Sequence, residues 1–439
     1  MFVAAVLAIT MSLPGQTNGV SPFTDPLMQA LQISRNALSL AYLIGTIISA
    51  TLLTYAGRIY DRFGSRSTGA IASVGLGLSL LYLSRLPALS GVLAETGLDP
   101  VVSTMAALTT GFFLIRFFGQ GVMTLVGRTM IFKWYDDKRG AANAVLSIAV
   151  PIVFSGAPLL FDALIRNAGW QGAWIILGLI LFPGFTLVAL TLFRDPPGRS
   201  PESTTAPAPA RRAVFVPRWL VRLIRRTGIR PTREPSRPPI DASFAEVVRS
   251  LPFWAFNGVI TMSSMLITGF TFHVVGIFAE AGIGRATALA VFLPSSIVSI
   301  LFQTFGSLLS DYIRLKYFAV LHALSLIALL ALLPFLGNSP VTYLLVVISH
   351  GISLALFGIN SAVVWPRFYG LTNLGTINGF AGAWMAFGSA LGPYAYSLSH
   401  DLLGGFSSIG LVFIPVCLVL VVTGFFANNP NRRFLVPDC

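Results

Sequence analysis

Charge is scarce in this chain of 439 residues: 10% of the positions are Asp, Glu, Lys or Arg, whereas 55% are hydrophobic. A soluble domain carries roughly 25% charged residues, so this chain cannot cover a water-exposed surface of its size. Apolar stretches of about 20 residues, the length that crosses a bilayer, recur along nearly the whole chain. The sequence therefore predicts an all-α integral membrane protein.

Cysteine is nearly absent as well. Cys417 lies in an apolar run and Cys439 is the last residue, so neither a disulfide framework nor a metal site of spaced cysteines is expected. Paired intramembrane acids, a metal-spaced His/Cys set and a nucleophile elbow are also missing from the sequence. These absences argue against an enzyme and against a bound metal or cofactor.

Apolar runs between breaks predict twelve spans. They are expected at residues 2–21, 38–56, 67–85, 103–131, 141–163, 172–193, 252–278, 286–307, 317–336, 341–365, 377–398 and 407–427. The first run has neither the basic start nor the small-residue cleavage pattern of a signal peptide, so we expect it to be the first span. A span that begins at Met1 is abrupt, and whether Met1 is the true start stays open.

The formal net charge of +13 is concentrated in loops on one side of the predicted membrane, and no motif for binding RNA or DNA occurs. That side holds Arg58, Arg62, Arg66, Lys133, Lys138, Arg139, Arg314, Lys316, Arg367, Arg432, Arg433 and the basic segment 194–250. The other side holds only Arg35, Arg85, Arg166 and Arg285. By the positive-inside rule, this side is cytoplasmic and both termini are expected in the cytoplasm. The membrane itself is expected to be a bacterial inner membrane.

The basic segment divides the chain. We expect an N-terminal six-helix bundle at 1–193, a cytoplasmic linker at 194–250, a C-terminal bundle at 251–427 and a cytoplasmic tail at 428–439. Pro-, Ser- and Arg-rich sequence of the linker cannot build a packed core. Within it, residues 211–226 fit either a short amphipathic helix on the membrane surface or a solvated basic segment.

The loop between the second and third spans carries a spaced set of glycines and charges. It reads Gly57-Arg58-Ile59-Tyr60-Asp61-Arg62-Phe63-Gly64-Ser65-Arg66. This segment resembles the cytoplasmic signature of the major facilitator superfamily, Gly-x-x-x-Asp-Arg-x-Gly-x-Arg. An ordinary positive-inside loop explains the arginines but not the glycine and Asp spacing. We expect both glycines to permit a close turn.

The resemblance covers nearly the whole chain outside 194–250. It implies two pseudo-symmetric six-helix bundles with a binding site between them near the midplane. It also implies gating roles for Gly57, Asp61, Arg62, Gly64 and Arg66, whose charge-assisted hydrogen bonds would hold the bundles shut on the cytoplasmic side. Asp311 is the counterpart of Asp61 in an eroded echo of the motif after the eighth span.

Residues 116–140 show a weaker similarity to bacterial carriers of the monocarboxylate and oxalate–formate branch. Those carriers place charged or acid–base residues within spans 8 and 11, whereas 286–307 and 377–398 contain none here. A carboxylate substrate is therefore left open by this similarity.

Strongly polar side chains in hydrocarbon are costly and usually face a cavity or a partner. They are enriched in predicted spans 1, 4, 7 and 10, which line the central cavity of the resembled fold. Pro14 and Gly15 predict a break in the first span. The candidates for binding a solute are Gln16, Asn18, Arg116, Gln120, His273, His350 and Asn360, with Gln303 and Trp384 as secondary candidates.

Arg116 is the sharpest candidate because it is permanently charged and central in its span. It either binds an anionic group or pairs with helix-end carbonyls and orders the bundle. His273 and His350 are candidates for titration during transport, although a lone histidine more often only makes a hydrogen bond. The sequence places no carboxylate deep in a span, which disfavours an acid-based proton relay and leaves histidine coupling, exchange or facilitated movement open.

The leading hypothesis is a secondary active or facilitative transporter of a small organic solute, with an anion as one option, that works by alternating access. The alternatives are a drug or metabolite efflux permease and, from another class, a non-transporting membrane sensor or assembly partner. The expected partners are a small-molecule substrate and the lipid bilayer, without nucleic acid, and a monomer is the expected state.

Overall fold

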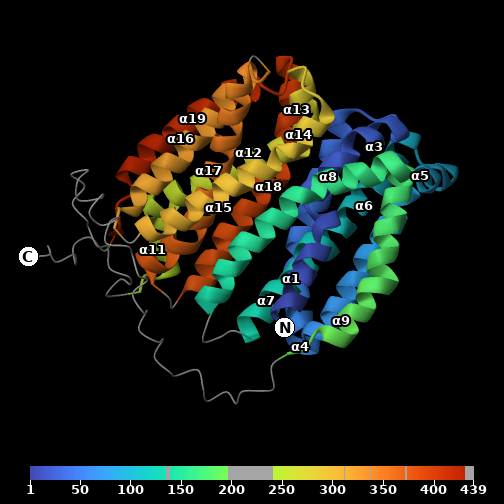
Figure 1. Cartoon of the computed structure of the whole chain (residues 1–439), viewed down its shortest axis with the longest axis horizontal. Coiled ribbons are helices and arrows are strands. Elements are labelled where there is room, and N and C mark those ends of the chain that lie inside the picture. The colour runs from blue at the N-terminus through green and yellow to red at the C-terminus, as the bar shows by residue number, and fades with distance from the viewer. Residues whose placement is uncertain (135–138, 196–240, 311, 338, 371–372, 431–439) are drawn as a thin grey trace, which may run out of the picture.

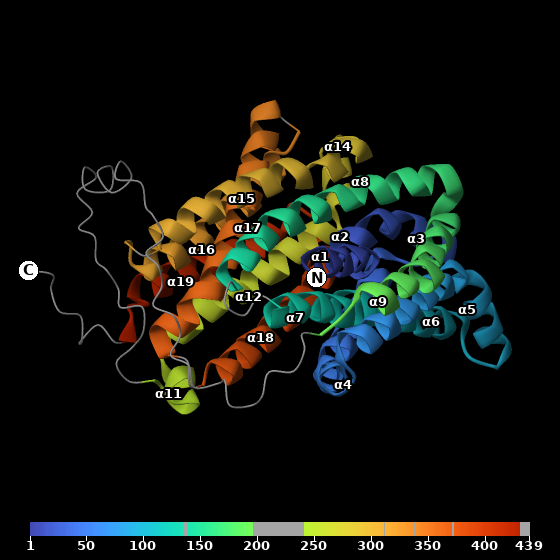
Figure 2. The same ribbon diagram turned by 60° about the horizontal axis from the view of Figure 1, so that its bottom comes forward.

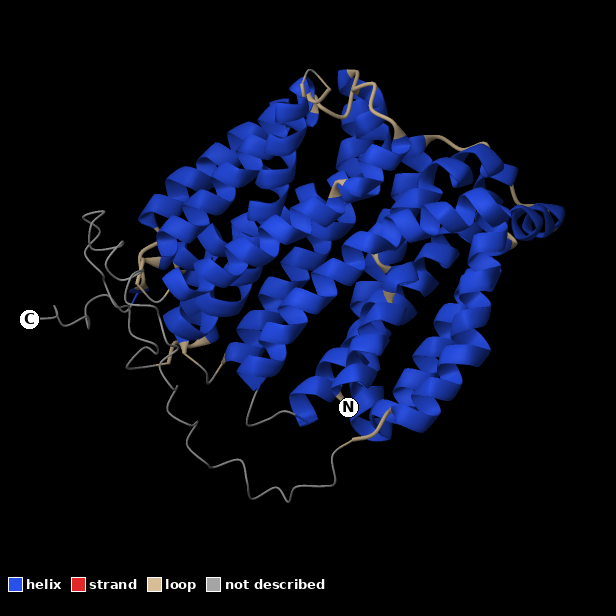
Figure 3. Ribbon diagram, in the orientation of Figure 1, coloured by secondary structure: helices blue, strands red, loops and turns tan. Residues whose placement is uncertain are grey.

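The computed structural model describes residues 1–134, 139–195, 241–310, 312–337, 339–370 and 373–430. Every regular element in these ranges is a helix (Figure 3). Nine helical segments of this part of the chain are long and apolar enough to cross a membrane. The predicted all-α membrane architecture is therefore confirmed, whereas the count of twelve spans stays a prediction.

The first half of the chain forms one group of helices, drawn from blue to green in Figure 1. Its elements are α1 (Phe2–Met11), η1 (Leu13–Gly15), α2 (Thr17–Val20), η2 (Ser21–Phe23), α3 (Thr24–Leu31), α4 (Arg35–Ser84), α5 (Leu86–Glu95), α6 (Pro100–Ile115), η3 (Arg116–Met123), α7 (Thr124–Trp134), α8 (Arg139–Leu179), η5 (Ile180–Phe185) and α9 (Thr186–Leu192).

The second half forms the other group, drawn from yellow to red. Its elements are α11 (Phe244–Arg249), α12 (Leu251–Phe272), α13 (Val274–Glu280), α14 (Arg285–Ala290), α15 (Phe292–Leu309), α16 (Leu315–Leu332), η7 (Leu333–Phe335), α17 (Pro340–Tyr369), α18 (Leu374–Leu403) and α19 (Ile409–Phe426). Helix α8 of the first half runs beside α15 of the second in both views (Figures 1 and 2).

Two long helical elements are in fact pairs of helices joined by a sharp turn. Helix α4 has 50 residues, about 75 Å at 1.5 Å per residue, which is more than twice the thickness of the hydrocarbon core. Its backbone turns at Gly64, where φ is 74°, and α8 turns in the same way at Gly169. The expectation that Gly57 also forms the turn is wrong, because the helix continues through Gly57 and only Gly64 adopts the left-handed conformation that favours glycine.

The first span is broken where the sequence predicts a break. Helix α1 ends at Met11, the single turn η1 follows, and Gln16 is extended before α2 begins. Gly15 packs directly on Gly119 of η3: a Cβ at Gly119 would lie 2.8 Å from the Cα of Gly15. Such a small-residue contact lets two membrane helices approach closely, so it brings the break in the first span against η3.

The buried apolar residues form two clusters, and each belongs almost wholly to one half of the chain. One cluster draws on residues from Ala4 to Phe193, and the other on residues from Val247 to Ala427. Phe272 is the buried residue that crosses over, since it lies in the cluster of the first half. Each half thus has its own core, which fits the predicted pair of bundles; the domain boundaries themselves stay a prediction.

The end of the predicted linker contains one described helix, α11, and a capping box starts it. Ser243 accepts from the backbone N–H of Glu246 while the Glu246 carboxylate accepts from the backbone N–H of Ser243. The side-chain and backbone hydrogen bonds from Ser243 lower the pKa of Glu246 below its usual range. The amphipathic helix considered at 211–226 lies outside the described residues.

Replacing Gly119 with alanine tests the close contact between η3 and the break in the first span. The new methyl group would press on the Gly15 backbone, and overpacking of this kind destabilises by about 1–3 kcal/mol. Gly156→Ala is the matched control, because a Cβ there meets nothing within 4 Å. Thermal unfolding in detergent should show a lower Tm for Gly119→Ala alone; equal Tm values would contradict the packing described.

Candidate functional site

Arg116 lies at the centre of the first half, at the start of η3. Only 2% of its surface is exposed. Its Nη1 donates to the carbonyl oxygen of Gly15 and to Oγ1 of Thr17, each at 3.3 Å. Its guanidinium carbon lies 5.1 Å from the ring centroid of Tyr42. The break in the first span therefore exposes the carbonyl group that Arg116 binds.

The charge of Arg116 is not balanced by a carboxylate in the part of the chain that the structure describes. Among these residues no carboxylate contacts it, and its Nε has no hydrogen-bond partner. Both of its hydrogen bonds go to neutral oxygen atoms and are long. One of these hydrogen bonds, to the Gly15 carbonyl, is the helix-end pairing that the sequence predicts as one alternative. The buried guanidinium is nevertheless poorly compensated. It therefore still has the capacity to bind an anion.

The other candidates of the first half surround this point. Gln16 donates to Oγ of Ser12 at 3.0 Å and to Oγ1 of Thr124 at 3.1 Å. Asn18 donates to the carbonyl oxygen of Phe154 at 3.4 Å, and the backbone of Gln120 lies against Gly15. Gln16, Asn18, Arg116 and Gln120 thus converge where the broken first span meets η3.

The candidates of the second half are not gathered in the same way. His350 is buried between Phe270 and Phe292. Asn360 contacts Nδ1 of His322 at 3.2 Å, and a Cβ on Gly358 would lie 2.9 Å from the Nε2 atom of Gln303.

Trp384 is 40% exposed and packs edge-on against Trp254. The partner of Asn360, His322, was not singled out in the sequence. Their contact joins α17 to α16 and is a packing contact between these two helices.

The described polar contacts between the two halves lie mainly at one end of the molecule, which we call the distal end. It comprises residues 21–39, 158–170, 273–288 and 393–408, and the turn at Gly64 is at the opposite end. Arg285 of the second half donates to Oδ1 of Asp162 at 2.6 Å and to the carbonyl oxygen of Pro22 at 2.6 Å, and lies 3.4 Å from Asp25. The Asp162 side chain is only 3% exposed.

A second group of distal contacts joins α4 to α18. Asn36 donates to Oδ2 of Asp401 at 2.6 Å and accepts from the hydroxyl of Ser397. Deeper in the same interface, Nε2 of His273 lies 2.8 Å from the carbonyl oxygen of Pro393 and 3.3 Å from Oγ of Ser39. His273 therefore lies between the halves at the distal end rather than beside Arg116.

Towards the middle of the molecule the contact between the halves becomes aromatic and sparse. The ring of Tyr42 lies 4.6 Å from that of Phe272, and Oγ of Ser296 donates to the carbonyl oxygen of Pro151 at 3.3 Å. Because Tyr42 also covers Arg116, the guanidinium lies just behind the surface where the halves meet.

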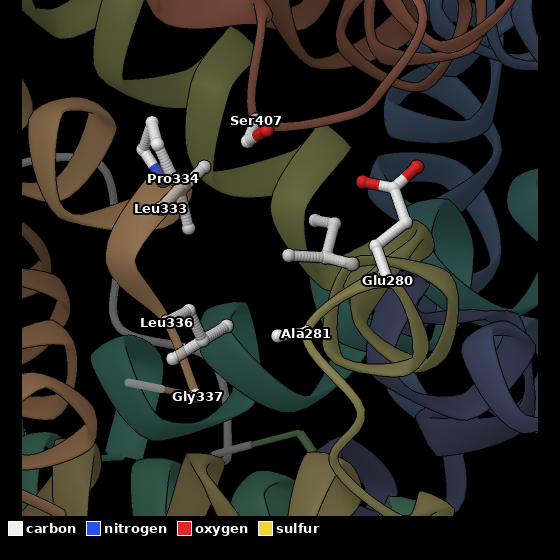
Figure 4. A pocket seen from close by; sticks show the side chains of 8 residues that line it. Glu280, Ala281, Leu333, Pro334, Leu336, Gly337 and Ser407 are labelled. Atoms are coloured by element: carbon white, nitrogen blue, oxygen red, sulfur yellow. The ribbon is translucent and has the colours of Figure 1, made fainter. Parts of the chain in front are cut away.

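A small cavity also opens at the distal end, inside the second half. Its lining residues are Ile277, Glu280, Ala281, Leu333, Pro334, Leu336, Gly337 and Ser407. Figure 4 shows Glu280 on one wall, across from Leu333 and Pro334. The Glu280 carboxylate already accepts from the backbone N–H of Phe406, so this cavity is a weaker candidate for a solute site than the Arg116 region.

The predicted gating motif is at the other end, and its described contacts stay within the first half. The Asp195 carboxylate accepts from the backbone N–H and the hydroxyl of Ser65, both at 2.7 Å. This caps the helix that begins after Gly64. Arg66 donates weakly to the carbonyl oxygen of Phe193. Arg62 is exposed. The side chain of Asp61 and the whole of Asp311 lie outside the described residues, so the latch between bundles stays a prediction.

Sequence reasoning missed Asp195 and the distal contacts. In the sequence, Arg285 and Arg35 stand out only as basic residues of the less basic side, and no pairing with Asp162 was predicted. One signal was available: the few charges on that side include both signs, at positions that flank spans of opposite halves. Opposite charges near the ends of spans can pair across a bundle interface.

Comparison with known proteins identifies the family. The family model described as Major Facilitator Superfamily matches residues 1–393. The chain therefore belongs to the major facilitator superfamily, and the predicted fold and membrane location are confirmed at that level. The similarity to the monocarboxylate and oxalate–formate branch stays a prediction.

Two curated relatives share part of the chain. An uncharacterized MFS-type transporter, YcxA of Bacillus subtilis (strain 168), is 25% identical over 194 residues, 42% of each chain. MFS-type transporter 1 of Ophiocordyceps sp. (strain BCC 1869) is 27% identical over 158 residues, 33% of this chain and 29% of that one. The matched segments thus span less than half the length of either relative.

A solved structure shares the fold over nearly the full length. The crystal structure of the nucleoside transporter NupG aligns with a TM-score of 0.64 and 13% identity, covering 97% of this chain and 98% of that one. At this identity the likeness establishes the fold alone.

Gly64→Ala tests the role of the Asp195 cap in shaping the turn of the motif. An added Cβ would collide with the Asp195 carboxylate, and the residue also needs a positive φ. Gly97→Ala is matched, since Gly97 has a φ of 92° but no neighbour within 4 Å. Both variants incur the backbone strain, so a larger fall in Tm for Gly64→Ala measures the clash. Equal falls would show that the cap tolerates it.

Proposed function

We propose that the protein is a secondary transporter that moves a small anionic organic solute across a bacterial inner membrane by alternating access, as a monomer with both termini in the cytoplasm. Membership of the major facilitator superfamily supports transport. The observation that carries the solute class is Arg116, a buried guanidinium at the junction of the broken first span and η3 that no carboxylate of the described residues contacts. The same site serves import or efflux.

An anionic solute would complete the coordination of Arg116. Its free Nε and the hydroxyl groups of Thr17 and Tyr42, which lie 2.9 Å apart, offer donors to one anionic group. A charge-assisted hydrogen bond in this water-poor site is stronger than those that Arg116 now makes to neutral oxygens. Gln16 and Gln120 are placed to contact the remainder of the solute.

Tyr42 connects this site to the interface between the halves. It packs on Arg116 from one side and on Phe272 of the second half from the other. A solute that pulls the guanidinium towards itself changes the support under Tyr42. Binding at Arg116 is therefore positioned to alter the contact between the halves, as alternating access requires.

The distal contacts form the gate on the external side. Arg285 joins the halves through ion pairs with Asp162 and Asp25, and Asp162 is almost fully buried. Opening the distal end must separate Arg285 from both carboxylates and hydrate all three groups. The motif around Gly64 forms the corresponding gate on the cytoplasmic side, with Asp61 as its central charge.

Arg116→Gln should abolish uptake of the anionic substrate into proteoliposomes, because Gln offers hydrogen bonds without charge. A thermal-shift screen of a metabolite library first finds the ligand, since a ligand at 100 times its Kd stabilises by about 2.7 kcal/mol. Arg85→Gln, which removes an exposed arginine, is the control and should transport normally. Full anion uptake by Arg116→Gln would refute the assigned site.

Arg285→Gln should open the external gate. Truncating one partner of a buried charge pair costs about 2–5 kcal/mol; the lower value applies because Arg285 is 32% exposed. About 2 kcal/mol shifts the population of open molecules by roughly 30-fold. A cysteine at Ser21, a fully buried distal residue, should then react faster with a membrane-impermeant maleimide in a background without Cys417 and Cys439.

Two variants check that this effect comes from the pair between halves. Arg166→Gln removes the other arginine of Asp162, which is 66% exposed and belongs to the same half, so labelling should stay slow. Arg285→Lys keeps the positive charge beside Asp162 and Asp25 and should also keep labelling slow. Fast labelling in Arg166→Gln, or slow labelling in Arg285→Gln, would show that the gate lies elsewhere.

A further inference from the structure

Phe406 fills the interface between the two halves at the distal end. The loop between α18 and α19 turns at Gly404, where φ is 80°, and inserts the Phe406 ring so that 1% of the residue is exposed. Gly276 makes room for it, since a Cβ there would lie 2.7 Å from the ring. Arg35 of the first half lies over the same ring, 5.1 Å from its centroid.

Two histidines pack on this ring as well. The centroid of His273 lies 5.0 Å and that of His400 4.7 Å from that of Phe406. Three groups that can carry positive charge, one of them from the opposite half, thus surround one aromatic side chain. Any proton that either histidine binds is placed near Arg35 when the distal end is closed.

The charge of His400 would be compensated. Its Nδ1 lies 2.8 Å from Oδ1 of Asp401 and its Nε2 lies 3.6 Å from Oε1 of Glu280. All three residues belong to the second half and move together. His400 is also 39% exposed, so it remains in contact with water while the distal end is closed.

His273 is in the opposite situation. It is 1% exposed, and its Nε2 contacts the Pro393 carbonyl and the Ser39 hydroxyl. Its Nδ1 has no hydrogen-bond partner among the residues that the structure describes. An imidazolium has two N–H donors, so protonation in the closed state would leave a buried donor unsatisfied and add a charge without a carboxylate partner.

The charged groups that face His273 from the surrounding elements reinforce this. Arg35 of α4 repels an imidazolium, and Asp25 of α3 is engaged with Arg35 at 3.9 Å and with Arg285 at 3.4 Å. On α18 and α13, Asp401 and Glu280 face His400 instead. Closing the gate therefore adds a cation and removes water from around His273.

We propose that His273 is the proton-binding site of the external gate: the closed gate holds it neutral, and binding a proton from the external side is coupled to opening. The proposal rests on the alternating access proposed above. Acidic external solution shifts the population towards the open gate, and alkaline solution towards the closed one. The direction follows because Arg35 and Ser39, which lie on the first half, leave His273 when the halves separate.

The test measures the gate directly, without any transported solute. Spin labels at Gln29 and Leu402, exposed residues of the two halves, report the distal separation by pulsed electron resonance in the full chain in nanodiscs, with Cys417 and Cys439 replaced. From pH 8 to pH 5.5, about one unit below the usual histidine pKa, the wild type should gain several-fold in its long-distance population.

Substitution of His273 supplies the first decisive pair. His273→Gln keeps a side-chain N–H for the Pro393 carbonyl but cannot titrate, and it should show the same distances at both pH values. His400→Gln removes the compensated histidine on the same ring and should respond as the wild type does. A response retained by His273→Gln, or lost only in His400→Gln, overturns the proposal.

Substitution of Ser39 supplies a second pair that leaves His273 in place. Ser39→Asp puts a carboxylate opposite Nε2, so the closed gate can accommodate an imidazolium and acid should no longer open it. Ser39→Asn has the same shape without charge and should keep the acid response. An acid response in Ser39→Asp equal to that of Ser39→Asn contradicts the charge mechanism even where the His273 variant does not fold.

The result separates the gate from the proposed transport. Anion uptake in a protein whose distal distance ignores pH would overturn the proton site and leave transport standing. Acid-dependent opening in a protein that moves no solute would overturn the proposed transport and leave the proton site standing.

Discussion

The structure depends on one constraint: a charge that leaves water must find compensation inside the protein. The chain has few charges, and two that are buried meet this constraint differently. Asp162 is compensated mainly by Arg285 across the interface between the halves, at 2.6 Å, and more weakly by the exposed Arg166 of its own half, at 3.6 Å. The stronger of the two contacts therefore exists only while the distal end is closed. Arg116 donates hydrogen bonds to the carbonyl of Gly15 and the hydroxyl of Thr17, which partly compensate its charge without neutralising it. The compensation of Asp162 therefore depends on the conformation, whereas the charge of Arg116 is available to a ligand.

Because the two halves have separate cores, a small number of charges can affect the balance between closed and open states. Each half packs its own apolar cluster, so a relative movement of the halves exposes little of either core. What such a movement breaks at the distal end is a short set of polar and aromatic contacts, from Arg285 with Asp162 to Arg35 over Phe406. Since hydrocarbon provides no hydrophobic drive between membrane helices, these contacts set much of the balance between closed and open states.

Composition and span spacing were sufficient to predict a helical membrane protein, and the motif at 57–66 carried its resemblance to this superfamily. The Pro14-Gly15 pair was sufficient to predict the broken first span. These features are local, because hydropathy and helix breaking depend on neighbouring residues. The partners of Arg285 could not be predicted, since Asp162 and Asp25 are more than a hundred residues away and pair with it only through the tertiary fold. Gly57 was misassigned for a related reason: a motif fixes spacing, whereas a helix can continue through a glycine when its neighbours support it.

The location of the titratable groups follows from the same constraint. A histidine near the centre of a bundle, such as His350 between Phe270 and Phe292, has no source of protons while aromatic rings enclose it. His273 faces Ser39 and Arg35 of the first half across the interface, so each opening of the distal end gives it water on that side and each closure removes it. A ligand shifts a two-state equilibrium only by its difference in affinity between the states. The interface between the halves gives His273 a different affinity for a proton in the closed and open states. The enclosed core gives His350 no such difference.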